Sequence, residues 1–152
     1  MKRVLVGFEY SGIVRDAFTL AGWDATSCDI LPSESPGQHI QSDFFKIDVS
    51  LFDLLIVHPP CTYLAKCGLS LCKNDPWRTA LKYQSLALIR QILTLSHDHI
   101  CIENPMGAIS TNIRPADQII HPWMFGDNYS KEICLWLKGL PVLRPWSPVR
   151  SV

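Results

Sequence analysis

The sequence predicts an α/β fold with a mostly parallel sheet. Short, continuously apolar runs of strand length recur along the chain, which is typical of strands buried on both faces of a parallel sheet. Each run ends in a polar or proline-containing turn, and helix start and stop residues lie between several of them. At 152 residues we expect one domain, 1–152, with a proline-rich C-terminal tail over 138–152.

The composition of the chain limits the classes of function that the protein can have. Hydrophobic residues make up 47%, charged residues 18%, and the formal net charge is zero. A strongly basic nucleic-acid platform is therefore excluded, and any phosphate contact needs a local patch. No apolar run approaches the ~20 residues that cross a bilayer, so we expect a cytoplasmic protein without membrane partners. We interpret the cysteines as reduced thiols and predict no metal site.

The first predicted unit is a strand, a turn, a helix and a second strand. The first strand covers 3–8, and Ser11 is predicted to cap a helix over 13–20. The second strand covers 23–28 and is followed by Asp29. A glycine-containing turn before a helix, with an acid at the tip of the next strand, is typical of nucleotide-binding units, where the acid takes the ribose hydroxyls. Because the turn has one glycine, an ordinary strand-turn-helix is an equally good interpretation.

The segments after this unit are less regular. Asp43 accepts a hydrogen bond from an adenine amino group in one interpretation and caps a short helix in the other, which the composition favours. We expect a surface loop over 31–41, a long loop over 66–77, a helix over 77–95, an irregular stretch over 106–123 and a strand over 133–137.

Two further strands end in rigid polar turns. The apolar run 54–57 ends in His-Pro-Pro-Cys, and the prolines terminate the strand because they cannot donate to a sheet ladder. Cys61 should therefore lie on a stiff loop at the sheet edge where α/β proteins bind ligands. A short strand over 99–102 ends in the same way at Glu103.

A thiolate and a carboxylic acid at one sheet edge suit the activation of a pyrimidine ring. Carbon 5 of a pyrimidine is a poor nucleophile, but addition of a thiolate to C6 turns the ring into an enamine that can attack an activated methyl group. A carboxyl group at ring N3 offsets the charge that builds up during the addition. A base then removes the C5 proton, and the thiolate leaves. Cys61 and Glu103 are thus candidate catalytic residues.

These motifs resemble those of DNA (cytosine-5) methyltransferases, in particular the short forms of bacteriophage genomes that lack a target-recognition domain. The stretch 4–12 resembles the glycine-containing cofactor loop of that family, with Tyr10 where a glycine is usual. Pro60-Cys61 resembles the proline-cysteine nucleophile motif, and Glu103-Asn104 the glutamate-asparagine motif. The motifs follow the family's order along most of the chain.

The resemblance implies a Rossmann-like class I methyltransferase domain that uses S-adenosyl-L-methionine (AdoMet). Lys131 is the nearest stand-in for the family's arginine motif, which helps to hold the flipped base, and Arg114 is a weaker candidate. The implied cofactor side consists of Phe8, Tyr10, Ser11, Gly12, Asp29, Ile30, Asp43 and Pro59. The implied substrate side consists of Pro60, Tyr63, Arg78 and Asn104.

The expected function is AdoMet-dependent methyl transfer to C5 of cytosine through a covalent bond between Cys61 and C6. Flipping a base out of duplex DNA costs a few kcal/mol, and a neutral chain without a recognition segment would do so poorly. The expected substrates are therefore single-stranded DNA, DNA presented by a partner chain, or a free cytosine nucleotide. A homodimer or a partner subunit is left open, as is a host cytoplasm for a phage-encoded chain.

Two alternatives stay open. Amino-group methyltransferases carry a polar residue, two prolines and an aromatic residue at this place, where the first residue and a backbone carbonyl hold the exocyclic amine. Here His58 and Cys61 replace the usual residues, with Tyr63 close by. The third interpretation is a non-catalytic methyltransferase fold that binds a nucleotide or a protein, because fold alone does not define function.

Overall fold

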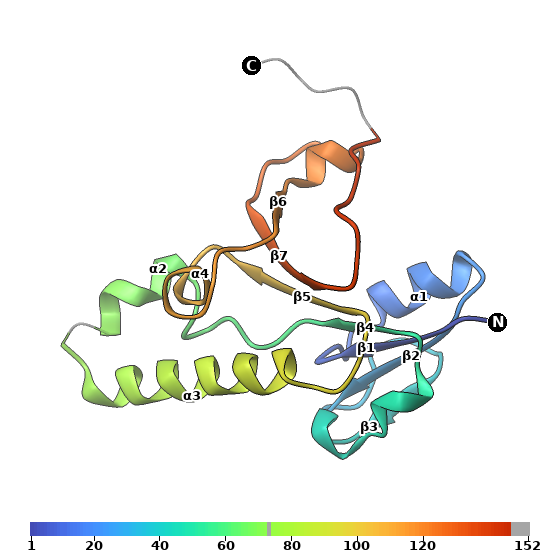
Figure 1. Cartoon of the computed structure of the whole chain (residues 1–152), viewed down its shortest axis with the longest axis horizontal. Helices are drawn as coiled ribbons and strands as arrows, with labels where there is room; N and C mark the ends of the chain where they lie inside the picture. Colours follow the sequence, from blue (N-terminus) through green and yellow to red (C-terminus); the bar gives the residue numbers. More distant parts are fainter. Residues whose placement is uncertain (73, 147–152) are drawn as a thin grey trace.

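Seven strands form one mixed sheet in the computed structural model, which describes residues 1–72 and 74–146 (Figure 1). The strands are β1 (Arg3–Gly7), β2 (Asp24–Asp29), β3 (His39–Gln41), β4 (Leu54–Val57), β5 (Ile100–Pro105), β6 (Gln118–Ile120) and β7 (Ile133–Lys138). The α-helices are α1 (Ile13–Leu20), α2 (Lys66–Leu69), α3 (Pro76–Leu93) and α4 (Ala108–Asn112). Short 3-10 helices cover Phe44–Lys46, Val49–Leu51, Ser70–Cys72 and Pro122–Phe125.

The strand order is β3-β2-β1-β4-β5-β7-β6. Strands β3, β2, β1, β4 and β5 pair in parallel, whereas β7 runs antiparallel to both β5 and β6. The first five positions have the order of a doubly wound α/β sheet, which reverses direction between β1 and β4. The predicted α/β fold with a mostly parallel sheet is therefore confirmed, and it is compatible with a Rossmann-like arrangement.

Both faces of the central strands are buried, because successive side chains of a strand point to opposite faces. Val4 and Val6 of β1 pack in one cluster with Val14 and Phe18 of α1. Leu5, between those two valines, packs in the second cluster. That cluster also holds the buried side chains of α3, which are Leu86, Ile89 and Ile92. Helices α1 and α3 thus cover opposite faces of the sheet.

Several predicted loops are structured. The predicted loop over 31–41 ends in β3, which pairs with β2. The predicted loop over 66–77 contains α2, and α3 begins at Pro76 because the Asp75 carboxylate accepts hydrogen bonds from the next free backbone N–H groups. The predicted irregular stretch over 106–123 contains α4 and β6. These elements are too short for hydrophobic periodicity to reveal them.

The predicted tail over 138–152 begins inside β7, since Lys138 is the last residue of that strand. Residues 139–146 then run back along β6. The backbone N–H of Leu143 donates to the Gln118 side chain, and the Trp146 N–H donates to the Met124 carbonyl at 3.1 Å. Residues 147–152 of the predicted tail lie outside the described residues. Within the described residues, none of the helices has both the length and the apolarity that crossing a membrane requires.

Candidate functional site

The polar ends of four parallel strands meet at one edge of the sheet. Because β1, β2, β4 and β5 run in parallel, their carboxyl ends lie together. Gly12 and Cys61 lie in the segments that follow β1 and β4, Asp29 is the last residue of β2, and Glu103 lies in the second half of β5. The structure therefore brings these four predicted site residues to the same edge.

Cys61 lies on a tight turn that is fastened to the end of β5. Its side chain is exposed, and its carbonyl accepts the backbone N–H groups of both Leu64 and Ala65 at 2.9 Å. The Leu64 carbonyl accepts the Ala108 N–H, and Ala65 forms an isolated bridge with Gly107. A side chain at Gly107 would collide with the Leu64 carbonyl, so a glycine is needed for this close approach.

Asn104 joins the Cys61 turn to β5 from inside the protein. The predicted end of the strand at residue 102 is wrong, because Glu103 and Asn104 continue β5 by pairing with β7. The side chain of Asn104 is 1% exposed, and its Nδ2 donates a hydrogen bond of 2.8 Å to the carbonyl of Pro59. The sequence assigned Asn104 to the substrate and Pro59 to the cofactor, but the contact that the structure shows joins them to each other. Because the proline rings stiffen the backbone, this bond helps to position the turn that carries Cys61, together with the backbone contacts of Leu64 and Ala65.

His58 contacts the predicted catalytic acid. Its Nδ1 lies 3.0 Å from Oε2 of Glu103, and both side chains are about one-quarter to one-third exposed (25% and 30%). The backbone N–H of His58 donates to the Gly7 carbonyl at 3.0 Å, which ties the residue to β1. Its Nε2 is buried without a hydrogen-bond partner among the described residues. The leading interpretation of the sequence gave His58 no role, although its place directly after a buried strand was the available clue.

A cleft of about 330 Å³ opens beside His58, between the end of β1 and the start of α1. Its lining contains three residues predicted for the cofactor, together with four others: Phe8, Glu9, Tyr10, Ser11, Ile13, Val14 and His58. The predicted first strand ends one residue early, because Phe8 has a φ of 59° in the left-handed region. Such strain at a strand end is typical of functional sites.

Glu9 is the residue of this cleft that the sequence interpretation missed. Its side chain is 6% exposed, and its two carboxylate oxygens accept the backbone N–H groups of Val14 at 2.6 Å and Arg15 at 3.2 Å. The predicted cap, Ser11, is wrong, because the N-cap position of α1 is Gly12 with a φ of 79° and no side-chain cap. Glu9 satisfies the free N–H groups of the helix instead.

A buried arginine holds the turn before α1. Arg15 is 1% exposed and donates hydrogen bonds to the hydroxyl groups of Ser27, Ser33 and Ser35. A side chain at Gly12 would collide with the Arg15 guanidinium, so the predicted cofactor glycine is required by this packing. Arg15 thus fastens the loop that follows β2 to the turn before α1.

The outer predicted cofactor residues lie farther along the edge. Asp29 accepts the backbone N–H of Leu31 at 2.9 Å through one carboxylate oxygen, and Ile30 is 72% exposed. Asp43 accepts the backbone N–H of Phe45 at 3.0 Å and caps the 3-10 helix that follows. Of the two predicted roles for Asp43, the cap is the one that the structure shows.

Two predicted substrate residues contact each other near the Cys61 turn. The guanidinium of Arg78 lies 5.5 Å from the ring centroid of Tyr63, which is within the range of a cation–π contact. Pro60, between Pro59 and Cys61, is exposed. This part of the edge therefore presents an aromatic ring and a cation side by side.

The two candidates for the base-holding cation differ in position. Lys131 is exposed and comes two residues before β7, whose first residue, Ile133, pairs with Pro105. Lys131 therefore approaches the same edge as Glu103. Arg114 instead pairs with Asp117 at 2.8 Å and donates to the Leu137 carbonyl at 3.2 Å. These contacts direct Arg114 toward the far part of β7.

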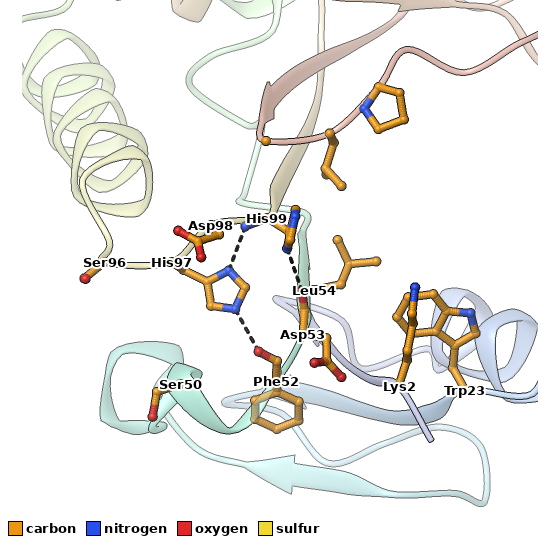
Figure 2. Close-up of a pocket in the computed structure, with 13 residues that line it drawn as sticks. Lys2, Trp23, Ser50, Phe52, Asp53, Leu54, Ser96, His97, Asp98 and His99 are labelled. Atoms are coloured by element: carbon orange, nitrogen blue, oxygen red, sulfur yellow. Dashed lines mark hydrogen bonds between the residues drawn. The ribbon is translucent and has the colours of Figure 1, made fainter.

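A larger cavity, of about 670 Å³, lies at the opposite, amino-terminal edge of the sheet (Figure 2). Its lining includes residues that precede β1, β2, β4 and β5, and none of the predicted site residues. Figure 2 shows the rings of His97 and His99 bonded to the backbone carbonyls of Phe52 and Asp53, at 2.9 and 3.2 Å. The histidines of this cavity thus bond to the backbone.

The six thiols divide into an exposed and a buried group. Cys61 and Cys67 are exposed, and all six cysteines are free. Burial raises the pKa of the Cys28 thiol to about 11 and that of Cys101 to about 12. Burial also raises the pKa of Cys134. A thiol must ionise to act as a nucleophile, so Cys28, Cys101 and Cys134, three of the four buried thiols, are unsuited to that role.

No protein-family model matches this chain, and no curated protein has significant sequence similarity to it. The functional argument therefore depends on the geometry of the site.

Proposed function

We propose that this protein is an AdoMet-dependent methyltransferase that modifies C5 of cytosine through a covalent bond between Cys61 and C6. The observation that carries the proposal is the junction of the Cys61 turn with strand β5. Asn104 binds the Pro59 carbonyl at 2.8 Å, and His58 contacts Glu103 at 3.0 Å. A stiff turn with an exposed thiol is thereby joined to a carboxyl group beside a cleft. In this proposal the mixed sheet is a Rossmann-like class I methyltransferase fold.

The chemistry needs one nucleophile and one proton donor from this chain. The Cys61 thiolate forms a bond to C6 of the ring, and Glu103 gives a proton to ring N3. AdoMet, when bound, supplies an electrophilic methyl group on a sulfonium. The ring then carries the new methyl group at C5, a base removes the C5 proton, and the bond between Cys61 and C6 breaks. The exposed position of the Cys61 thiol supports this role.

Glu9 supports a cofactor that carries positive charge near α1. Cofactors with phosphate groups bind at a helix N-terminus through its free N–H groups. Here the Glu9 carboxylate accepts hydrogen bonds from the N–H groups of Val14 and Arg15 and adds negative charge to the cleft. A pyrophosphate would therefore meet a carboxylate. The sulfonium and ammonium groups of AdoMet suit this environment, and Phe8 and Tyr10 supply apolar surface beside it.

The remaining proposed cofactor contacts are Ser11 in the cleft and Asp29 at the end of β2. A carboxylate oxygen of Asp29 is the proposed partner of the ribose hydroxyls, as in other sheets of this order. Ile30 and Asp43 are further proposed contacts on the cofactor side of the site. They would contact the adenine, Ile30 through its exposed apolar side chain and Asp43 through a carboxylate oxygen.

The pair of Tyr63 and Arg78 supports a nucleic-acid substrate without an intact duplex. Aromatic rings that stack on unpaired bases, together with cations that contact the backbone, are typical of single-strand binding. The proposed substrates are single-stranded DNA, DNA presented by a partner chain, or a cytosine nucleotide. Lys131 is the proposed third catalytic group. It would help to hold the cytosine ring from the β7 side.

Methyl transfer from labelled AdoMet to single-stranded DNA, duplex DNA, RNA and cytosine nucleotides tests the proposal. We expect transfer to cytosine and a covalent adduct with a 5-fluorocytosine substrate. Cys61→Ala should abolish both results. Cys67→Ala is the matched control, because Cys67 is the other exposed thiol. Transfer by Cys61→Ala at the wild-type rate would contradict the mechanism.

The two alternatives give different results in the same assay. An amino-group methyltransferase would put the methyl group on the exocyclic nitrogen, which mass spectrometry of the product distinguishes from C5. That alternative needs the first residue of the motif and a backbone carbonyl, and here the Nδ1 of His58 and the Pro59 carbonyl already have partners. Absence of AdoMet binding by the folded protein in calorimetry would favour the non-catalytic alternative.

A further inference from the structure

Glu103 has to hold a proton for the proposed reaction, and an ordinary glutamate is ionised at neutral pH. The following inference rests on the proposed function and concerns how the site keeps that proton. The hydrogen-bond partner of Glu103 is important for this, because the group that is hydrogen-bonded to a carboxylate affects whether the carboxylate holds a proton.

His58 is that partner. Its Nδ1 lies 3.0 Å from Oε2 of Glu103, and within residues 1–72 and 74–146 it is the basic side chain that pairs with this carboxylate. Its backbone N–H is bonded to Gly7, and the two prolines follow it directly. The ring is therefore held against Glu103 by the stiff part of the chain. Histidine is also the side chain that changes charge between pH 5 and 8.

The groups around the pair favour an extra proton. Glu9, from the turn before α1, lines the same cleft as His58 and is negatively charged. Burial raises the pKa of the Cys101 thiol, and the charge of Glu103, two residues along β5, raises it further. Cys101 therefore stays neutral and adds no charge beside the pair. Lys131, two residues before β7, is exposed, so the solvent weakens the effect of its charge on the pair.

We propose that His58 and Glu103 share one proton, which passes from Glu103 to ring N3 of the cytosine as the Cys61 sulfur bonds to C6. The proton returns to the pair when the bond between sulfur and C6 breaks. The proton from C5 leaves to solvent through the base, so the pair is unchanged over a complete cycle. His58 reaches the substrate only through Glu103 and is therefore a positioning residue.

Two substitutions of His58 distinguish proton sharing with Glu103 from a role in which His58 only holds the Glu103 side chain in place. His58→Asn retains an N–H donor for Glu103 but cannot carry a proton, whereas His58→Ala removes both. Positioned proton transfer contributes about 10²–10⁴-fold to a rate. We expect His58→Asn to lower methyl transfer at neutral pH by about 10²-fold, the low end of that range, and to move the alkaline loss of activity to lower pH. Imidazole in the buffer should partly restore His58→Ala.

The test measures methyl transfer to a cytosine oligonucleotide between about pH 5 and 8, the range in which histidine titrates. His99→Asn is the matched control, since His99 lies at the opposite sheet edge. An unchanged rate and pH profile for His58→Asn, in an active wild-type background, would overturn the inference and leave the proposed function standing.

A second measurement is independent of activity. NMR titration of the His58 ring in wild type and in Glu103→Gln reports the pairing directly. We expect His58 to lose its charge at lower pH in Glu103→Gln, because the amide does not stabilise an imidazolium as a carboxylate does. Identical titrations would overturn the pairing. Absence of methyl transfer by wild type with a shifted titration would instead reject the proposed function alone.

Discussion

The two edges of the sheet use histidine in opposite ways. At the amino-terminal edge, in the cavity of about 670 Å³, His97 and His99 bond to the backbone carbonyls of Phe52 and Asp53. At the carboxyl-terminal edge, beside the cleft of about 330 Å³, His58 bonds to a carboxylate and has an unpartnered buried nitrogen among the described residues. Of the two, the smaller cleft is thus the one that lies beside side chains with polar atoms available for binding or catalysis.

The physical reason lies in strand direction. Parallel strands deliver the residues that follow them to one edge, so polar groups from β1, β2, β4 and β5 converge there. The opposite edge receives connecting turns whose polar groups satisfy one another. Cavity size is therefore a weaker guide to the site than the convergence of side chains with free polar atoms.

The largest expected effect comes from exchanging one polar group at each edge. Glu103→Gln should lower kcat/KM for methyl transfer by about 10²–10⁴-fold, because the amide cannot give a proton to N3. His99→Asn at the other edge should leave kcat/KM within about twofold, as expected for a surface substitution outside the site. Equal losses in both variants would mean that the edges do not differ in function.

The next effect concerns the bond that joins the Cys61 turn to β5. Asn104→Ala leaves the buried Pro59 carbonyl without a partner and should lower the free energy of unfolding by about 1–3 kcal/mol in urea denaturation. Methyl transfer should fall as well, since the Cys61 turn loses its support. Asn112→Ala is the control, because Asn112 donates to the Ala108 carbonyl from an exposed position and should cost less.

A smaller effect is expected at the cleft between β1 and α1, the proposed cofactor site. Glu9→Gln weakens the cap of α1 and should cost about 0.5–2 kcal/mol of unfolding free energy. Because the negative charge is lost, AdoMet affinity measured by calorimetry should fall further than stability alone explains. Asp75→Asn changes the corresponding cap of α3 and serves as the comparison. Unchanged AdoMet affinity in Glu9→Gln would remove the argument for a cationic cofactor.

The smallest perturbation is alkylation of the native protein. Iodoacetamide should modify Cys61 and Cys67 rapidly at pH 8 to 9 and spare Cys28, Cys101 and Cys134, which mass spectrometry of peptides can determine. The pKa of about 11 for Cys28 and about 12 for Cys101 exceeds the ordinary value of 9.0. Their contribution to stability is therefore complete below pH 9 and is lost as the pH rises toward these values. Early alkylation of Cys101 would show that the core opens readily.

The sequence predicted which polar segments meet at one edge of the sheet, but it did not predict the contacts that these segments make. The buried strands β1, β4 and β5 were recognisable because a parallel sheet requires continuous apolar runs. The short elements β3, α2, α4 and β6 were missed, because three to five residues are held by tertiary pairing and show no periodicity. The role of Glu9 as a cap was hidden, since a glutamate five residues before its partner matches no local capping pattern.

By itself, then, the sequence determined the alternation of strands and helices, the stiff turn that carries Cys61, and the acid that follows the apolar part of β5. Each follows from local chemistry, namely apolar runs, prolines and polar residues at their ends. The tertiary structure alone decided that His58 meets Glu103 and that Asn104 holds Pro59, because each pair is separated by 45 residues in the chain. Only the parallel pairing of β4 with β5 brings such distant residues within hydrogen-bond distance.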